Sequence, residues 1–218
     1  MKILEMDQGS PQWYAVRRGR PTGSMFSRII TPAKGEPAAA ADTYAAELIA
    51  EACGWQSGFH GTPDTVRGTS LESEALRWLK MRHGYITRQV GFCLSDCGRY
   101  GCSPDGLTPE NIPVEVKAPS LHTFLKWRIA GGLPQDHKVQ VHAEMHVCEA
   151  DTAIFLAYAD HPALDNHMVI VKRDKFTDLI GPIVDNFCDR LEKLQRELLG
   201  EEYECIIRSV PQIMEDAA

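Results

Sequence analysis

The sequence predicts an α/β domain in which a mixed central β-sheet is flanked by helices. Apolar or alternating segments typical of strands lie at 85–95, 100–103, 112–117, 152–159 and 167–172, and we expect the first three to form an antiparallel meander. Longer segments with apolar residues at helical spacing precede, separate and follow them. The chain has 218 residues, 44% hydrophobic and 24% charged, which suits one globular domain with a sizeable core.

The N-terminal region predicts two short helices that meet at a polar turn. Ser10 and the proline after it are a typical N-cap and first helical residue. Thr22 and Ser24 then open a second helix, which runs through Ile30. Its free N–H groups, the two hydroxyls and the nearby Arg17 would form a seat for a phosphate. The alternative is a pair of amphipathic helices with solvated arginines.

Two longer helices are predicted at 42–53 and 65–83. The second has an apolar stripe at helical spacing that is expected to face the core. Glu72 flanks this stripe, where its carboxylate can enter a metal site from the side. The loop between the two helices contains Trp55 and Phe59, aromatic side chains that either stack on bases or cover the core.

Two carboxylates and a lysine are concentrated around the third predicted strand. Asp105 lies in a Pro-Asp-Gly turn, and Glu115 and Lys117 leave the same face of an alternating strand. A turn and a strand end can aim all three at one point, where the carboxylates and the carbonyl of Val116 suit a hard cation such as Mg²⁺. Lys117 would then lie beside an activated water and the charge that develops on a phosphate. This is the PD-(D/E)xK nuclease pattern; the alternative is a surface hairpin with an ordinary Glu/Lys face.

Cysteine spacing does not predict a transition-metal site. Cys93, Cys97 and Cys102 lack the C-x2-C spacing of zinc sites and have no fourth ligand near them in the sequence. Seven scattered cysteines, an odd number, fit free thiols in a reducing cytoplasm.

Two further helices are predicted at 120–129 and 134–149. In the second, His142 and His146 are four residues apart but do not form the His-Glu-x-x-His motif of metalloproteases. We therefore expect Gln140 and a histidine to line the wall of an active site rather than to bind zinc.

The charge is distributed unevenly. Residues 1–34 contain six Lys/Arg against two Asp/Glu, whereas 174–218, which begin with a helix capped by Asp174, contain eleven Asp/Glu against five Lys/Arg. The net charge of −7 excludes a broadly basic DNA-coating protein, so a nucleic acid would have to meet a local basic surface in a channel or cleft. No run of 18 apolar residues occurs, so we expect neither a signal peptide nor a membrane span.

Several segments, taken in order, resemble the lambda exonuclease family, the YqaJ-like viral recombinase nucleases of the PD-(D/E)xK superfamily. The similarity runs through most of the chain. The segments that carry it are Trp13–Gly19, Thr22–Ser24, Gly68-x3-Glu72-x2-Ala75, Cys102–Leu107, Glu115–Lys117, Phe124–Arg128 and Val139–Val141 with Met145. The resemblance implies a restriction-endonuclease-like core in a single exonuclease domain over residues 1–200. The acidic tail over 201–218 has no counterpart in the family.

The resemblance also implies roles for individual residues. Asp105 and Glu115 would bind a catalytic Mg²⁺, for which Mn²⁺ would substitute, with Glu72 and the carbonyl of Val116 as further ligands. Lys117 would position the attacking water. Gln140 would lie near the scissile phosphate. The residues that would bind the 5′-phosphate and DNA are Arg17, Thr22, Ser24, Ser103 and Arg128.

In activity, the resemblance implies a Mg²⁺-dependent 5′→3′ exonuclease that degrades one strand of duplex DNA and leaves 3′ overhangs for recombination. It implies a toroidal homotrimer around the DNA, a single-strand annealing protein as partner and no membrane. Two alternatives stay open: a restriction-type endonuclease on the same core, and a non-catalytic DNA-end-binding subunit. Three carboxylates held together against their repulsion argue against the second alternative.

Overall fold

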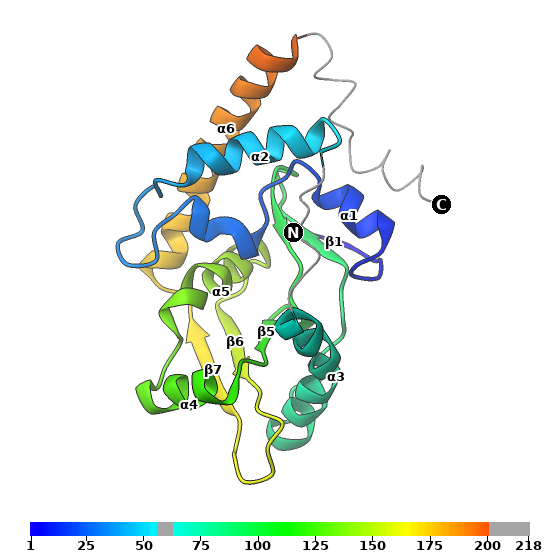
Figure 1. The fold of residues 1–218 in the computed structure, drawn as a ribbon, viewed down its shortest axis with the longest axis vertical. Helices are drawn as coiled ribbons and strands as arrows, with labels where there is room; N and C mark the ends of the chain where they lie inside the picture. Colours follow the sequence, from blue (N-terminus) through cyan, green and yellow to red (C-terminus); the bar gives the residue numbers. More distant parts are fainter. Residues whose placement is uncertain (56–62, 201–218) are drawn as a thin grey trace.

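The computed structural model describes residues 1–55 and 63–200, with the backbone alone for 63–70. It confirms the α/β class (Figure 1). The elements, in chain order, are β1 Lys2–Leu4, α1 Pro11–Arg17, the 3₁₀ helix η1 Gly23–Arg28, α2 Ala41–Ala52, α3 Pro63–His83, β2 Phe92–Leu94, β3 Gly101–Cys102, β4 Gly106–Leu107, β5 Pro113–Lys117, α4 Leu121–Ala130, α5 Gln135–Val147, β6 Thr152–Ala157, β7 His167–Lys172 and α6 Lys175–Leu199.

The described strands form two sheets. β1, β2 and β3 make an antiparallel sheet, and a second sheet has the order β4-β5-β6-β7. In the second sheet β5 and β6 are parallel while both outer pairs are antiparallel, so this sheet is mixed, as predicted. The prediction of one antiparallel meander from residue 85 to 117 is wrong, because the chain leaves the first sheet after Cys102 and enters the second at Gly106.

Helices cover both faces of the four-stranded sheet (Figure 1). α3 buries its apolar stripe against Val114 and Val116 of β5. On the opposite face, α4 and α5 bury apolar side chains against Phe155 of β6. Because side chains alternate along a strand, Glu115 and Lys117 leave β5 on the side of α5. Glu115 and Lys117 are thus set between β5 and α5, and Glu72 belongs to the middle of α3.

The helix starts follow local capping chemistry. Ser10 accepts a hydrogen bond from the N–H of Trp13 at the start of α1, and Asp174 caps α6 in a capping box with Thr177. The helix predicted from Thr22 differs: η1 is a 3₁₀ helix, and the Thr22 side chain makes no cap hydrogen bond. A tight 3₁₀ turn fits a segment of six residues packed between the first sheet and α5.

Some expectations fall outside the described residues: Phe59 in the loop after α2, and the acidic tail at 201–218. Within the described part of the chain, none of the helices is both long and apolar enough to cross a bilayer.

Candidate active site

The Pro-Asp-Gly turn and strand β5 bring the three predicted residues together. Asp105 immediately precedes β4, which pairs with β5, and its Oδ2 accepts the N–H of Val116 at 2.6 Å. Glu115 is 2% exposed and forms an ion pair with the ammonium of Lys117 two residues later. The turn, the strand pairing and this ion pair therefore fix the two carboxylates and the amine relative to one another.

Glu72 approaches the same group from α3. Burial raises the pKa of Glu72, and the charge of Glu115 raises it further. Burial likewise raises the pKa of Asp105 well above its ordinary value, followed by the charges of Glu115 and Glu72. Carboxylates shift one another in this way only across a short distance with little water between them. Glu72, Asp105 and Glu115 thus lie within electrostatic reach of one another, but among the described residues their carboxylate oxygens do not form a group in which all lie within 4.8 Å of one another.

Lys117 remains charged in this setting. Burial opposes its charged form, but the charges of Glu115 and Asp105 more than offset burial and raise the pKa of Lys117. The side chain is 31% exposed, so its ammonium sits between the acidic group and solvent.

Helix α5 adds a carboxylate that sequence reasoning missed. Glu144 is 1% exposed, and its Oε1 accepts a hydrogen bond from Gln140 Nε2 at 3.2 Å. Its Oε2 is buried without a hydrogen-bond partner among the described residues. Burial raises the pKa of Glu144 well above its ordinary value, and the charge of Glu115 adds to this. The signal that could have found Glu144 is its spacing of four from Gln140, which puts both on one helix face.

The donor set fits a hard divalent cation. Carboxylates arrive from α3, the turn before β4, β5 and α5, and one carboxylate oxygen lacks a partner. Burial is the first cause of their raised pKa values, and the charges of neighbouring carboxylates add to it. Mg²⁺ and Mn²⁺ prefer such all-oxygen sites.

A second polar cluster surrounds Arg17. The Arg17 guanidinium stacks on Trp13, with its Cζ 4.1 Å from the ring centroid. Its nitrogens donate hydrogen bonds to Ser103 Oγ at 3.4 Å and to Thr22 Oγ1 at 3.5 Å. Ser103 also accepts the Trp13 Nε1–H at 2.9 Å. Burial lowers the pKa of Arg17, so its charge is held in a partly dehydrated position. Ser24 is exposed on η1, two residues after Thr22.

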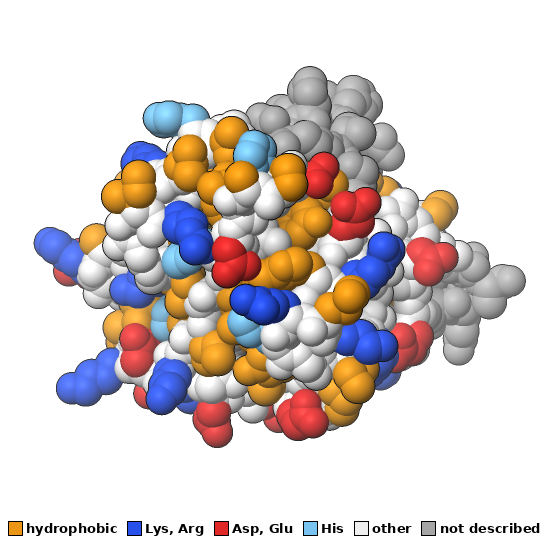
Figure 2. All heavy atoms as spheres, turned by 90° about the horizontal axis from the view of Figure 1, so that it is seen from below, with side chains coloured by type: hydrophobic (Ala, Val, Ile, Leu, Met, Phe, Trp, Pro, Cys, Tyr) orange, Lys and Arg blue, Asp and Glu red, His pale blue; other side chains and the backbone are white. Residues whose placement is uncertain are grey.

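Arg128 lies in a different part of the molecule. It is on α4, at the opposite end of the fold from α1 (Figure 1), and donates hydrogen bonds to the carbonyls of Asp165 and Asn166. Figure 2 shows the molecule from that lower end: basic, acidic and hydrophobic side chains are interspersed there rather than gathered into a basic patch.

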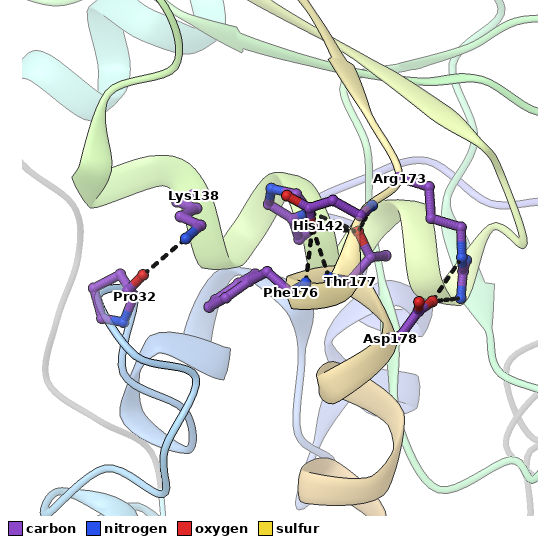
Figure 3. A network of polar contacts seen from close by, with 8 residues as sticks. Pro32, Lys138, His142, Arg173, Phe176, Thr177 and Asp178 are labelled. Carbon is purple, nitrogen blue, oxygen red and sulfur yellow. Dashed lines mark hydrogen bonds and ion pairs between the residues drawn. The ribbon is translucent and has the colours of Figure 1, made fainter.

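The histidine beside the acidic group is His137, which was not singled out from the sequence. Its ring stacks on Phe155, and burial, with the charge of Lys117, lowers its pKa to about 4. His142 instead points to the start of α6, where its Nδ1 lies 2.7 Å from Thr177 Oγ1 (Figure 3). His146 lies 3.1 Å from the Tyr100 hydroxyl. These two histidines join helices and strands of the core.

The chain is similar to known proteins in sequence and in fold. The family model of the YqaJ-like viral recombinase domain matches residues 12–151. An alkaline exonuclease from Laribacter hongkongensis, solved alone and in complex with dAMP, superposes with a TM-score of 0.72 at 24% identity, covering 86% of this chain and 97% of that one. A phage-related exonuclease from Haemophilus somnus 129PT superposes with a TM-score of 0.66 at 14% identity, covering 85% of this chain and 99% of that one. No curated protein matches. The fold is the restriction-endonuclease-like one of these structures.

Proposed function

The chain belongs to the YqaJ-like viral recombinase family, and from this premise we propose that it is a Mg²⁺-dependent exonuclease that digests one strand of duplex DNA from 5′ to 3′. The observation that carries the proposal is that a turn and a strand hold Asp105 against the backbone of Val116, between the ion-paired Glu115 and Lys117, with Glu72 of α3 within electrostatic reach. The products would be 3′ overhangs suited to recombination by strand annealing.

The acidic residues would hold the cation. Asp105, Glu115 and Glu72, with the carbonyl of Val116, are the proposed ligands, and Glu144 is a further carboxylate within their electrostatic reach. Mg²⁺ or Mn²⁺ bound there would lower the pKa of a water and neutralise charge on the phosphate.

The surrounding side chains orient the substrate. The raised pKa of Lys117 keeps its ammonium charged at neutral pH, so it can bind a phosphate oxygen as negative charge develops. Gln140, held by Glu144, would offer its amide to the scissile phosphate or to the attacking water. The Val116 N–H keeps the Asp105 carboxylate in one orientation.

Direction would come from the Arg17 cluster. A partly buried guanidinium, aligned by Trp13 and accompanied by two hydroxyls, suits a terminal 5′-phosphate. Thr22, Ser24 and Ser103 are the proposed hydroxyl donors, and the position of Ser103 two residues before Asp105 supports a seat near the acidic site. The Laribacter hongkongensis enzyme was solved with dAMP, a 5′-nucleotide of the kind this digestion would release.

The assembly is proposed by the same reasoning. An acidic exterior with a basic N-terminal region suits a ring of three chains that encloses DNA, with Arg128 near the duplex and a single-strand annealing protein receiving the overhang. The exonuclease domain would be residues 1–200, with 201–218 as a tail.

A linear duplex labelled at either its 5′ or its 3′ end tests the proposal. With Mg²⁺, the 5′ label should be released first as a mononucleotide, and EDTA should stop the reaction. Initial release from the 3′ end would contradict the direction. Cutting of a covalently closed duplex would support the endonuclease alternative, and end binding without digestion would support the non-catalytic one.

A further inference from the structure

Three buried cysteines converge away from the acidic site. Cys93 and Cys102 are opposite each other in the β2–β3 pair, and Cys148 is the C-cap of α5. The three side chains are at most 2% exposed, and their sulfur atoms all lie within 4.8 Å of one another. The Cys102 and Cys148 sulfurs are 4.0 Å apart. The sequence pattern did not predict this group, because Cys148 is 46 residues from Cys102 and Cys97 is exposed instead of joining them.

Core packing alone does not require this arrangement. A free cysteine behaves as a small hydrophobic side chain, so its sulfur can point at any apolar neighbour. Here strand register puts two thiols on the same face of the first sheet, and the last turn of α5 brings the third to them. Apolar residues of the largest core cluster surround the group. The sulfurs therefore face one another inside the core.

The spacing matches that of a single ion. With metal–sulfur bonds of about 2.3 Å, the sulfurs of a trigonal site lie roughly 4.0 Å apart. One pair is already at this separation, and movements well below an ångström would bring in the third sulfur. Sulfur donors without oxygen select soft cations and disfavour Mg²⁺.

We propose that Cys93, Cys102 and Cys148 form a binding site for a thiophilic d¹⁰ cation of the Zn²⁺, Cd²⁺ or Cu(I) class. Metal–sulfur bonds form as the thiols release their protons to solvent, and no electron is transferred. A divalent ion on three thiolates leaves one net negative charge, and Arg17 lies within the electrostatic reach of Cys102.

Such an ion would connect parts of the fold that carry the active site. Cys102 precedes Ser103 of the Arg17 cluster, and Cys148 ends the helix that carries Gln140 and Glu144. A bound cation would cross-link β2, β3 and α5, and would stabilise the folded chain because the unfolded chain has no preformed site.

The test uses the full chain, purified under a non-thiol reductant and freed of metal. Cd²⁺ is the first probe, because thiolate ligation gives an ultraviolet charge-transfer band that carboxylate ligation does not. We expect one equivalent to produce the band and to raise the melting temperature. The variants Cys93→Ala, Cys102→Ala and Cys148→Ala should each weaken binding at least tenfold. Zn²⁺ and Cu(I), buffered by competing chelators, then distinguish between members of the class.

A matched control removes three of the four other thiols and leaves the buried Cys188 in place. The triple variant Cys53→Ser, Cys97→Ser and Cys205→Ser keeps the buried cluster intact and should bind Cd²⁺ like the parent chain. Absence of the band in the parent chain, or loss of the band in the triple variant, overturns the proposal. The parent chain answers the question even if a buried Cys→Ala variant fails to fold. A melting shift caused only by peroxide, with no response to metal, would assign the cluster to disulfide chemistry instead.

Discussion

At the scale of single residues, the acidic site consists of carboxylates that repel one another and a lysine that attracts them. Asp105, Glu72 and Glu144 all have raised pKa values because burial and neighbouring carboxylates disfavour their ionised forms. Lys117 offsets part of this charge through its ion pair with Glu115. The folded site disfavours the ionised form of its own carboxylates. A cation bound there would relieve this repulsion, so the site has an affinity for cations.

Asp105→Asn separates catalysis from stability. The amide keeps the shape of the side chain but removes one ligand charge, so we expect turnover with Mg²⁺ to fall by about 10²-fold or more. Melting of the metal-free variant should be unchanged or higher, since one repelling charge is gone. Glu110→Gln, an exposed carboxylate in the next turn, is the control and should keep normal turnover. Near-normal digestion by Asp105→Asn would refute the metal assignment.

Arg17→Ala tests the 5′-phosphate seat. Removal of the guanidinium should lower digestion of 5′-phosphorylated duplexes by about 10-fold or more while 5′-hydroxyl duplexes change little, because only the former use the charge. Competition between the two substrates measures this preference. Arg18→Ala, at the exposed neighbouring position, should leave the preference intact. Equal losses on both kinds of end would remove Arg17 from end recognition.

At the scale of elements, local sequence predicted the helices better than the sheets. Three helices begin close to where they were predicted, and each has a capping side chain that accepts a backbone N–H: Ser10, Ser120 and Asp174. These caps depend on neighbours within three residues, so the sequence contains the whole interaction. The strands β3 and β4 have two residues each, and their division between two sheets depends on partners that are distant in the chain.

Asp174→Ala measures the contribution of one cap to the core helix α6. Losing its hydrogen bonds to the N–H groups of Phe176 and Thr177 should cost about 1 kcal/mol of unfolding free energy. For a chain of this size the melting temperature should fall by roughly 2–4 °C. Lys175→Ala, exposed in the same turn, should have a much smaller effect. If the two variants melt alike, the capping box contributes nothing measurable.

At the scale of the whole molecule, the acidic site links folding to pH and to cations. A carboxyl group with a raised folded-state pKa binds more protons folded than unfolded, so its contribution to stability is lost as pH rises through that pKa. The lowered pKa values of His137, His142 and His146 act in the opposite direction, but only below about pH 6.5, where the unfolded imidazoles take up protons.

Above about pH 6.5, therefore, each of these carboxyl groups that is still protonated in the metal-free folded chain makes the unfolding free energy decrease with pH, by about 1.4 kcal/mol per pH unit for each proton lost. Denaturant titrations measure this slope. Saturating Mg²⁺ should flatten it by compensating the ionised carboxylates, and Glu144→Gln should flatten it without metal. A flat profile for the metal-free parent chain would show that these carboxyl groups are already ionised near neutrality.

The sequence by itself determined the local chemistry: the helix caps, the Pro-Asp-Gly turn and the alternation that puts Glu115 and Lys117 on one face of β5. Each of these depends on residues a few positions apart, and so it can be read from spacing. Only the tertiary structure decided which distant residues meet. Glu144 joins Glu115 through the packing of α5 on the sheet, and Cys148 joins Cys93 and Cys102 through its last turn. Such contacts depend on how buried faces pack, and residue spacing along one chain does not specify that packing.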